Sequence, residues 1–164
     1  MAAQNINMEI MEYMVWVVEI VSMEFFGNDK ATAYQALKNS GLWDIYVNHY
    51  DATHTLGREY LLEEIKEYFT EHEVKFYVSI PRLRAELAQK RGVNMFDDTS
   101  LIRMVIEDLA EKHNWTYEET LDKFYNSKVC KGLSDKRTGM FTFAPREIIE
   151  LYEQEEEACN SSPD

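Results

Sequence analysis

The pattern of hydrophobic positions predicts a long first helix over residues 7–26. Ile10, Met14 and Val17 follow one another at intervals of three or four residues, which places side chains on one face of an α-helix. The other faces are apolar as well, because they carry Val15, Trp16, Val18 and Ile20. Because a helix that is apolar on most sides is normally buried on several of them, this segment is expected to form the centre of the core.

Shorter amphipathic helices are predicted along the rest of the chain. Gly27 ends the first helix, Asn28 or Asp29 can cap the second, and Gly41 ends the second. Residues 42–50 are expected to form a short helix or turn, and 51–57 a loop. A helix is predicted from residue 58, with Tyr60, Leu61, Ile65 and Phe69 toward the core, and another from about residue 98, with Ile102, Val105, Ile106 and Leu109 on one face. Three more are predicted from local signals: one from Pro81 to Gly92, one that begins at the Thr116–Glu119 capping box, and one from Pro145 to about Glu156.

One stretch, "KGLSDKRTGMFTFAP", breaks the helical spacing. The alternation between Met140 and Phe143 predicts a short hairpin or an extended loop near 132–144. The chain has few residues that break helices, since it contains only six glycines and three prolines. The predicted fold class is therefore all-α, a compact helical bundle.

Two short motifs recur and predict an internal repeat. Asn39-Ser40 returns as Asn126-Ser127, 87 residues later, and Arg58-Glu59 returns as Arg146-Glu147, 88 residues later. The surrounding helix pattern recurs in the same order. The predicted organisation is a first helical half (1–73), a connecting segment and helix (74–97), a second helical half (98–157) and a disordered tail (158–164).

The net charge of −13 is unevenly distributed. Residues 1–73 hold 13 acidic and 4 basic residues, and therefore carry most of the negative charge. Such a chain is repelled by phosphate backbones, which argues against nucleic-acid binding. The charge serves either solubility alone or the steering of a basic partner protein.

Two further features concern the compartment. The apolar run from Tyr13 to Phe26 contains Glu19 and Glu24, so it is too short and too charged to cross a membrane. Cys130 and Cys159 form no C-x-x-C motif, and so few cysteines fit a reducing compartment. We therefore expect a cytoplasmic protein.

The stretch "NHYDATHTLGREYLLEEI" carries the densest candidate chemistry. His49, Asp51 and His54 could ligate zinc or act in acid–base catalysis, although zinc needs three or four converging ligands. The other interpretation is a polar loop in which Asp51 or Thr55 caps the helix that begins at Arg58. The loop interpretation is favoured, because the H-x-D-x-x-H spacing matches no established site.

Other reactive residues lack the context that catalysis requires. Neither the glutamates at 63, 64 and 67 nor the acidic set at 107, 108 and 111 belongs to a Glu-x-x-His motif, so solvated helix faces are expected. Ser40 and Ser127 lack a G-x-S-x-G context. Lys128 and Lys131 could lower the pKa of Cys130, but a structural cysteine is favoured. No catalytic, cofactor or metal site is therefore assigned.

The aromatic residues include candidates for partner binding. Three tryptophans and ten tyrosines are more than helices of this size need, and both types anchor protein interfaces. The candidates lie around the two equivalent loops of the predicted repeat. They are Tyr46, Tyr50, His54, Phe141 and Phe143.

Two segments together resemble an uncharacterised family of small, acidic, helical bacterial proteins. The first, "SGLWDIYVNHYDATHTLGREYLLEEIKEYF", has an aliphatic-aspartate-aromatic stretch, then Tyr50, His54-Thr55 and an acidic helix. The second is "TYEETLDKFYNSKVCKGLSDKRTGMFTFAPREIIELYEQE". The resemblance implies a helical fold and supplies no catalytic residues. Members of this kind are often encoded beside ADP-ribosyltransferase-like toxin genes, which implies an antitoxin or partner role.

The leading expectation is a non-catalytic protein-interaction module, an antitoxin-like partner that binds and restrains a bacterial effector enzyme. One alternative is a small metal-binding or enzymatic bundle that uses the 49–54 loop. Another is an acidic mimic of nucleic acid. The chain could also form a homodimer, because a repeat of this kind can exchange halves between two copies.

Overall fold

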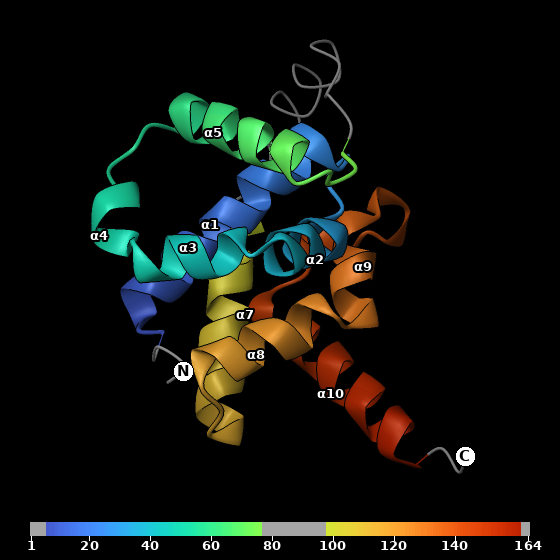
Figure 1. Ribbon diagram of the computed structural model, residues 1–164. Helices are drawn as coiled ribbons and strands as arrows, with labels where there is room; N and C mark the ends of the chain where they lie inside the picture. The colour runs from blue at the N-terminus through green and yellow to red at the C-terminus, as the bar shows by residue number, and fades with distance from the viewer. Residues whose placement is uncertain (1–5, 77–97, 162–164) are drawn as a thin grey trace.

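All regular structure in this protein is helical in the part of the chain that the computed structural model describes, residues 6–76 and 98–161. The first half contains α1 (Met8–Phe25), α2 (Lys30–Ser40), α3 (Leu42–Asn48), α4 (Tyr50–Thr53) and α5 (Arg58–Glu71) (Figure 1). The second half contains α7 (Asp98–His113), α8 (Tyr117–Tyr125), α9 (Lys128–Ser134), the 3-10 turns η1 (Lys136–Thr138) and η2 (Met140–Thr142), and α10 (Pro145–Ser161). The predicted all-α class is confirmed. The helix predicted from Pro81 to Gly92 lies outside the described residues.

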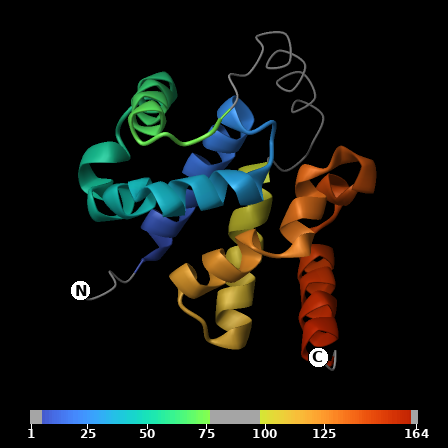
Figure 2. The ribbon, with the colours of Figure 1, turned by 45° about the vertical axis from the view of Figure 1, so that its right-hand side comes forward.

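Helix α1 forms the centre of the bundle, as its apolar faces predict. It contacts α2, α3 and α5 of its own half and α7 and α8 of the other half (Figures 1 and 2). Asn7 caps its N-terminus, because its side-chain oxygen accepts a hydrogen bond from the backbone N–H of Ile10 at 2.9 Å. The buried residues of α1 are Met11, Tyr13, Met14, Val15, Val17, Val18, Glu19, Ile20, Val21, Ser22, Met23 and Phe25.

Most of the predicted helix boundaries are confirmed. Asp29 caps α2 by accepting from the backbone N–H of Thr32. Gly41 ends α2 in the left-handed region, with φ of +84°, which glycine adopts without steric cost. Thr116 and Glu119 form the predicted capping box at the start of α8, and each side chain accepts from the other residue's backbone N–H.

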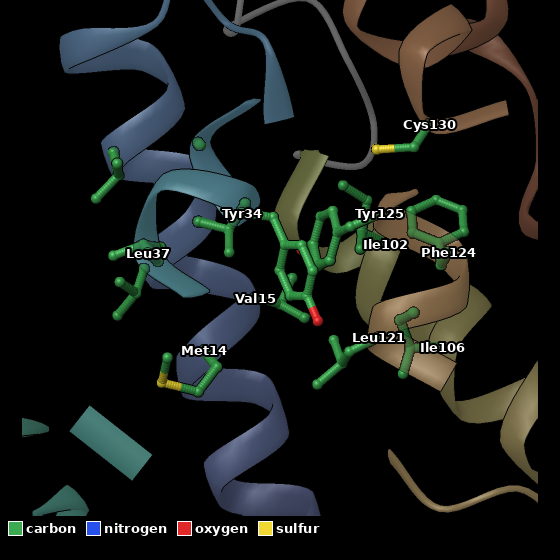
Figure 3. Close-up of a cluster of buried hydrophobic side chains, with 14 of the residues drawn as sticks. Met14, Val15, Tyr34, Leu37, Ile102, Ile106, Leu121, Phe124, Tyr125 and Cys130 are labelled. Atoms are coloured by element: carbon green, nitrogen blue, oxygen red, sulfur yellow. The ribbon is translucent and has the colours of Figure 1, made fainter. Parts of the chain in front are cut away.

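An aromatic cluster joins the two halves between α2 and α8. The ring of Tyr34 stacks on that of Tyr125, with centroids 4.8 Å apart, and both residues are fully buried (Figure 3). The Tyr34 hydroxyl donates a hydrogen bond of 2.9 Å to the carboxylate of Asp122. The predicted buried face of α7, which includes Ile102 and Ile106, closes the same core. The halves therefore share one hydrophobic core.

An ion pair is buried where α1, α2 and α9 meet. The Lys30 ammonium lies 3.4 Å from the Glu19 carboxylate, and both side chains are almost inaccessible to solvent. The ammonium also donates to the side-chain oxygen of Asn28, and the backbone N–H of Lys30 donates to the Ser134 hydroxyl. Charges so deeply buried persist only when they are paired and hydrogen-bonded.

The hairpin predicted near 132–144 is wrong, because the 3-10 turns η1 and η2 occupy this stretch. The hydroxyls of Thr138 and Thr142 donate to nearby carbonyls, those of Gly132 and Gly139 respectively. The backbone N–H of Thr142 also donates to the carbonyl of Gly139. These local bonds use groups that a strand ladder would need.

Two further expectations from the sequence need correction. Helix α10 continues to Ser161, so residues 158–161 are helical and do not belong to a disordered tail. The stretch from 51 to 57, which was predicted to be a loop, begins inside the short helix α4. Only His49 separates α4 from α3. The hydroxyl of Thr53 donates to the carbonyl of this histidine.

Candidate functional site

The His49–His54 stretch does not converge on a common point. His49 lies between α3 and α4, Asp51 lies in the first turn of α4, and all of His49, Asp51 and His54 are exposed. Nδ1 of His54 lies 2.6 Å from the carbonyl oxygen of Tyr50, and the His54 ring stacks on the Tyr50 ring at 4.4 Å. Within the described ranges no group of three His, Cys, Asp or Glu residues could hold a metal ion.

The helix that follows this stretch lacks the predicted side-chain cap. Gly57 is the N-cap of α5, and it has no side chain that could accept a hydrogen bond from the first turn of the helix. The Thr55 hydroxyl donates to the carbonyl of Ala52 instead, and Asp51 lies in α4. The prediction that Asp51 or Thr55 caps α5 is therefore wrong.

Of the predicted partner-binding aromatics near α4, Tyr46 is fully buried and offers no surface to a partner. Its burial raises the pKa of the phenol, and Glu64 and Tyr13 add to the effect. Tyr50 is half-buried, and its ring meets the ring of Tyr13 edge-on at 5.5 Å. Of the three candidates in this region, only His54, stacked on Tyr50, is exposed.

The corresponding aromatics of the second half lie near η2. Phe143 is half-buried and packs against the core. The backbone of Phe141 belongs to η2, and its side chain lies outside the described part of the structure. The loop therefore contributes Phe143 to the packing of the core more than to the surface.

An open groove lies beside the first two turns of α5, next to the C-terminal end of α1. We call it the α1–α5 groove, and its volume is about 880 Å³. Tyr60 lies in its wall with 61% of its surface exposed, although the sequence pattern predicted that this residue faces the core. The groove is lined by Glu24, Phe25, Gly57, Arg58, Glu59, Tyr60, Leu62, Glu63 and Lys66.

The exposure of Tyr60 follows from the spacing along α5. Leu61, Ile65 and Phe69 follow one another at intervals of four and are all fully buried. Tyr60 lies about 100° around the helix from Leu61, and the residues three and four positions later are Glu63 and Glu64. An aromatic residue whose i+3 and i+4 neighbours are both acidic was the signal that could have placed Tyr60 on the surface.

The two serines of the repeated Asn-Ser motif have structural roles at helix ends. The Ser40 hydroxyl donates to the carbonyl of Leu37 at the end of α2. Ser127 is the N-cap of α9, where its side chain accepts from the backbone N–H of Cys130. Neither has the surroundings of a nucleophile.

The thiol of Cys130 is fully buried, and this burial raises its pKa to about 12. The charges of nearby Lys30 and Lys131 lower the pKa of the thiol, but by less than burial raises it. A cysteine with a raised pKa is a poor nucleophile, so Cys130 has a packing role.

Within the residues that the structure describes, no helix is long and apolar enough to cross a membrane. Neither a curated protein nor a solved structure matches the chain. A family described as "Protein of unknown function (DUF3791)" matches residues 12–72, which run from α1 to the C-terminal end of α5. Over this first half the chain is therefore similar to a family of unknown function, as its sequence motifs predicted.

Proposed function

We propose that this chain is a non-catalytic protein-interaction module, an antitoxin-like partner that binds and restrains a bacterial effector enzyme. The observation that carries the proposal is the exposed Tyr60 in the α1–α5 groove, inside the family-matched segment 12–72. Tyrosine is enriched among the residues that dominate binding energy, because its ring offers apolar area and its hydroxyl offers a hydrogen bond.

The groove has the mixture of surfaces that protein interfaces use. Leu62, which is half-buried, supplies apolar area beside Tyr60, while Glu59 and Glu63 supply negative charge. A central aromatic anchor with a polar rim is the usual arrangement of a binding surface. The groove is open along α5, which suits an extended or helical segment of a partner protein.

The charge of the first half favours a basic partner surface. Residues 1–73 carry 13 acidic and 4 basic residues, and several of the acidic residues project from α5. Complementary charge raises the rate of encounter and selects against acidic partners. An effector enzyme with a basic face near its active site would therefore be attracted to this half.

The test is to co-express the tagged chain with the genes adjacent to its own and to identify what co-purifies. We expect a stoichiometric protein whose enzymatic activity falls when the chain is bound. A tagged chain that retains no protein from its gene neighbourhood would contradict the proposal. If a partner is retained but keeps its full activity, the module binds without restraining an enzyme, and the antitoxin-like role is wrong.

A further inference from the structure

A second groove lies at the other end of α1. It is bounded by the first turn of α1, the last turns of α7 and the start of α8, and we call it the α1–α7 groove. Its volume is about 520 Å³. Since α1 has 18 residues, the two grooves lie about 27 Å apart along its axis. All residues that line this second groove lie outside the family-matched segment 12–72.

The apolar part of the α1–α7 groove is formed by the start of α1, the residue just before its N-cap, and the connection between α7 and α8. Ile6 is buried at its base, Met8 is 47% exposed, and Trp115 is half-buried in the connection between α7 and α8. Methionine adapts its shape to an incoming apolar side chain, and Trp115 adds the part of its indole that stays exposed beside the His113 ring and the Lys123 ammonium. These are the side chains of an interface centre.

The wall formed by α7 is acidic. Glu107, Asp108 and Glu111 line the groove, and no lysine or arginine is found among the described residues that line it. Arg103 lies 3.9 Å from Glu107 and offsets one of these charges. In the described part of the chain neither Asp108 nor Glu111 forms an ion pair, so both carboxylates remain to attract a cation.

The ring of Trp115 is held in place before any partner arrives. The His113 ring stacks on it at 4.3 Å, and the Lys123 ammonium lies 4.9 Å from the ring centroid. Nε2 of His113 is itself 3.4 Å from the Glu153 carboxylate of α10. Because a side chain that is already ordered loses little entropy on binding, this arrangement lowers the cost of association.

We infer that the α1–α7 groove is a second docking surface, which takes a short basic amphipathic helix of a partner protein. An apolar side chain of that helix would pack against Met8 and Trp115, and a lysine or arginine would face Asp108 and Glu111. Helices commonly bind in grooves between helices in this way. Nucleic acid is excluded as the occupant because the carboxylate wall would repel its phosphates.

The test uses a helical peptide of lysine and leucine at amphipathic spacing, with a control peptide in which glutamate replaces each lysine. Trp16, Trp43 and Trp115 give three indole N–H signals in an NMR spectrum. We expect the lysine peptide to shift the Trp115 signal, to leave that of the buried Trp43 unchanged, and to be displaced by salt. The glutamate peptide should cause no shift.

Two matched variants distinguish binding of the peptide in the α1–α7 groove from its attraction to any acidic surface of the protein. The D108N/E111Q variant should weaken binding of the lysine peptide at least tenfold. The E67Q/E71Q variant removes two exposed charges from α5, and it should change the affinity by less than threefold. Both variants should melt within a few degrees of the wild type, since all four carboxylates are exposed.

Four outcomes would overturn the inference. They are the absence of any binding, equal weakening in the two variants, a shift confined to signals other than that of Trp115, and equal binding of the two peptides. A Trp115 signal that moves with protein concentration alone would assign the groove to a second copy of the chain instead.

Discussion

The last helices of the two halves, α5 and α10, are each hydrogen-bonded to an earlier part of their own half, but through different side chains. Each reaches back to the junction between the second and third helices of its half. In the first half the Tyr68 hydroxyl donates to the carbonyl of Ser40 at 2.7 Å. In the second half the Glu155 carboxylate accepts from the backbone N–H groups of Lys128 and Val129, at 2.8 and 3.1 Å.

The positions of these side chains agree with the predicted duplication. Tyr68 and Glu155 are 87 residues apart, the same separation as Ser40 and Ser127. The succession of a long helix, two shorter helices, an irregular segment and another long helix is also shared. The internal repeat stays a prediction, and these parallels favour it.

The two last helices differ in how firmly they are attached. Helix α10 contacts both α7 and α9, and its Glu153 carboxylate lies 2.7 Å from the Lys112 ammonium. Helix α5 packs mainly on α1 (Figures 1 and 2). Its Tyr60 is exposed beside the α1–α5 groove. Helix α10 is thus held by contacts with two helices and an ion pair, whereas α5 leaves an aromatic side chain exposed.

The largest expected effect comes from the buried ion pair of the first half. Eighty-seven residues after Glu19 and Lys30 the second half has Ile106 and Tyr117. Lys30→Met removes the cation beside the buried Glu19 carboxylate, so it should lower the free energy of unfolding by about 3–5 kcal/mol. Urea denaturation followed by circular dichroism measures this loss.

The control for this variant makes the first half more like the second. Glu19→Ile combined with Lys30→Met removes both charges, and it should recover most of the lost stability. If the double variant is as unstable as Lys30→Met, shape and not charge governs this site.

A smaller effect should distinguish the two last helices. Glu155→Ala removes the acceptor of two backbone N–H groups at the start of α9 and should cost about 1–2 kcal/mol. Tyr68→Phe removes one neutral hydrogen bond and should cost about 0.5–1.5 kcal/mol. Thermal melts of both variants provide the comparison. A larger loss for Tyr68→Phe would contradict the view that α10 is the more firmly attached helix.

The smallest effect depends on pH. The hydrogen bond from Lys112 lowers the pKa of Glu153 below its ordinary 4.5, with a smaller contribution from His113. A lowered carboxyl pKa contributes stability above pH 4.5, and this contribution is lost as the pH falls through the folded-state pKa. Lys112→Met should therefore cost roughly 0.2–1 kcal/mol at pH 7. The difference from wild type should vanish in acid, and a pH-independent difference would contradict this assignment.

Much of the fold could be predicted from local sequence signals. The apolar faces of α1 and α7, the glycine at the end of α2 and the Thr116–Glu119 capping box each act within a few residues. The 3-10 turns could not be predicted, because the alternation from Met140 to Phe143 resembles a strand. The turn is instead stabilised by the Thr138 hydroxyl, which donates to the carbonyls of Gly132 and Asp135. The Glu155 cap of α9 joins residues far apart in the sequence, so no local pattern shows it.

The candidate site was harder to predict than the fold. Aromatic content selected Tyr46 as a partner-binding candidate, but α3 directs this side chain into the core. The exposed ring is Tyr60, one position away from the buried stripe of α5. Neighbouring residues of a helix point in directions about 100° apart. A sequence assignment that is wrong by one position can therefore place a buried residue on the surface, or an exposed residue in the core.

The most direct test of the α1–α5 groove is the affinity of the co-purified partner for two matched variants. Tyr60→Ala removes the exposed aromatic ring of the groove, and Ile45→Ala removes an exposed apolar side chain on α3, which is 40% accessible. Calorimetric titration should show at least a tenfold loss of affinity for Tyr60→Ala and less than a twofold change for Ile45→Ala. Equal affinities for the two variants would show that the partner binds elsewhere and would contradict the account.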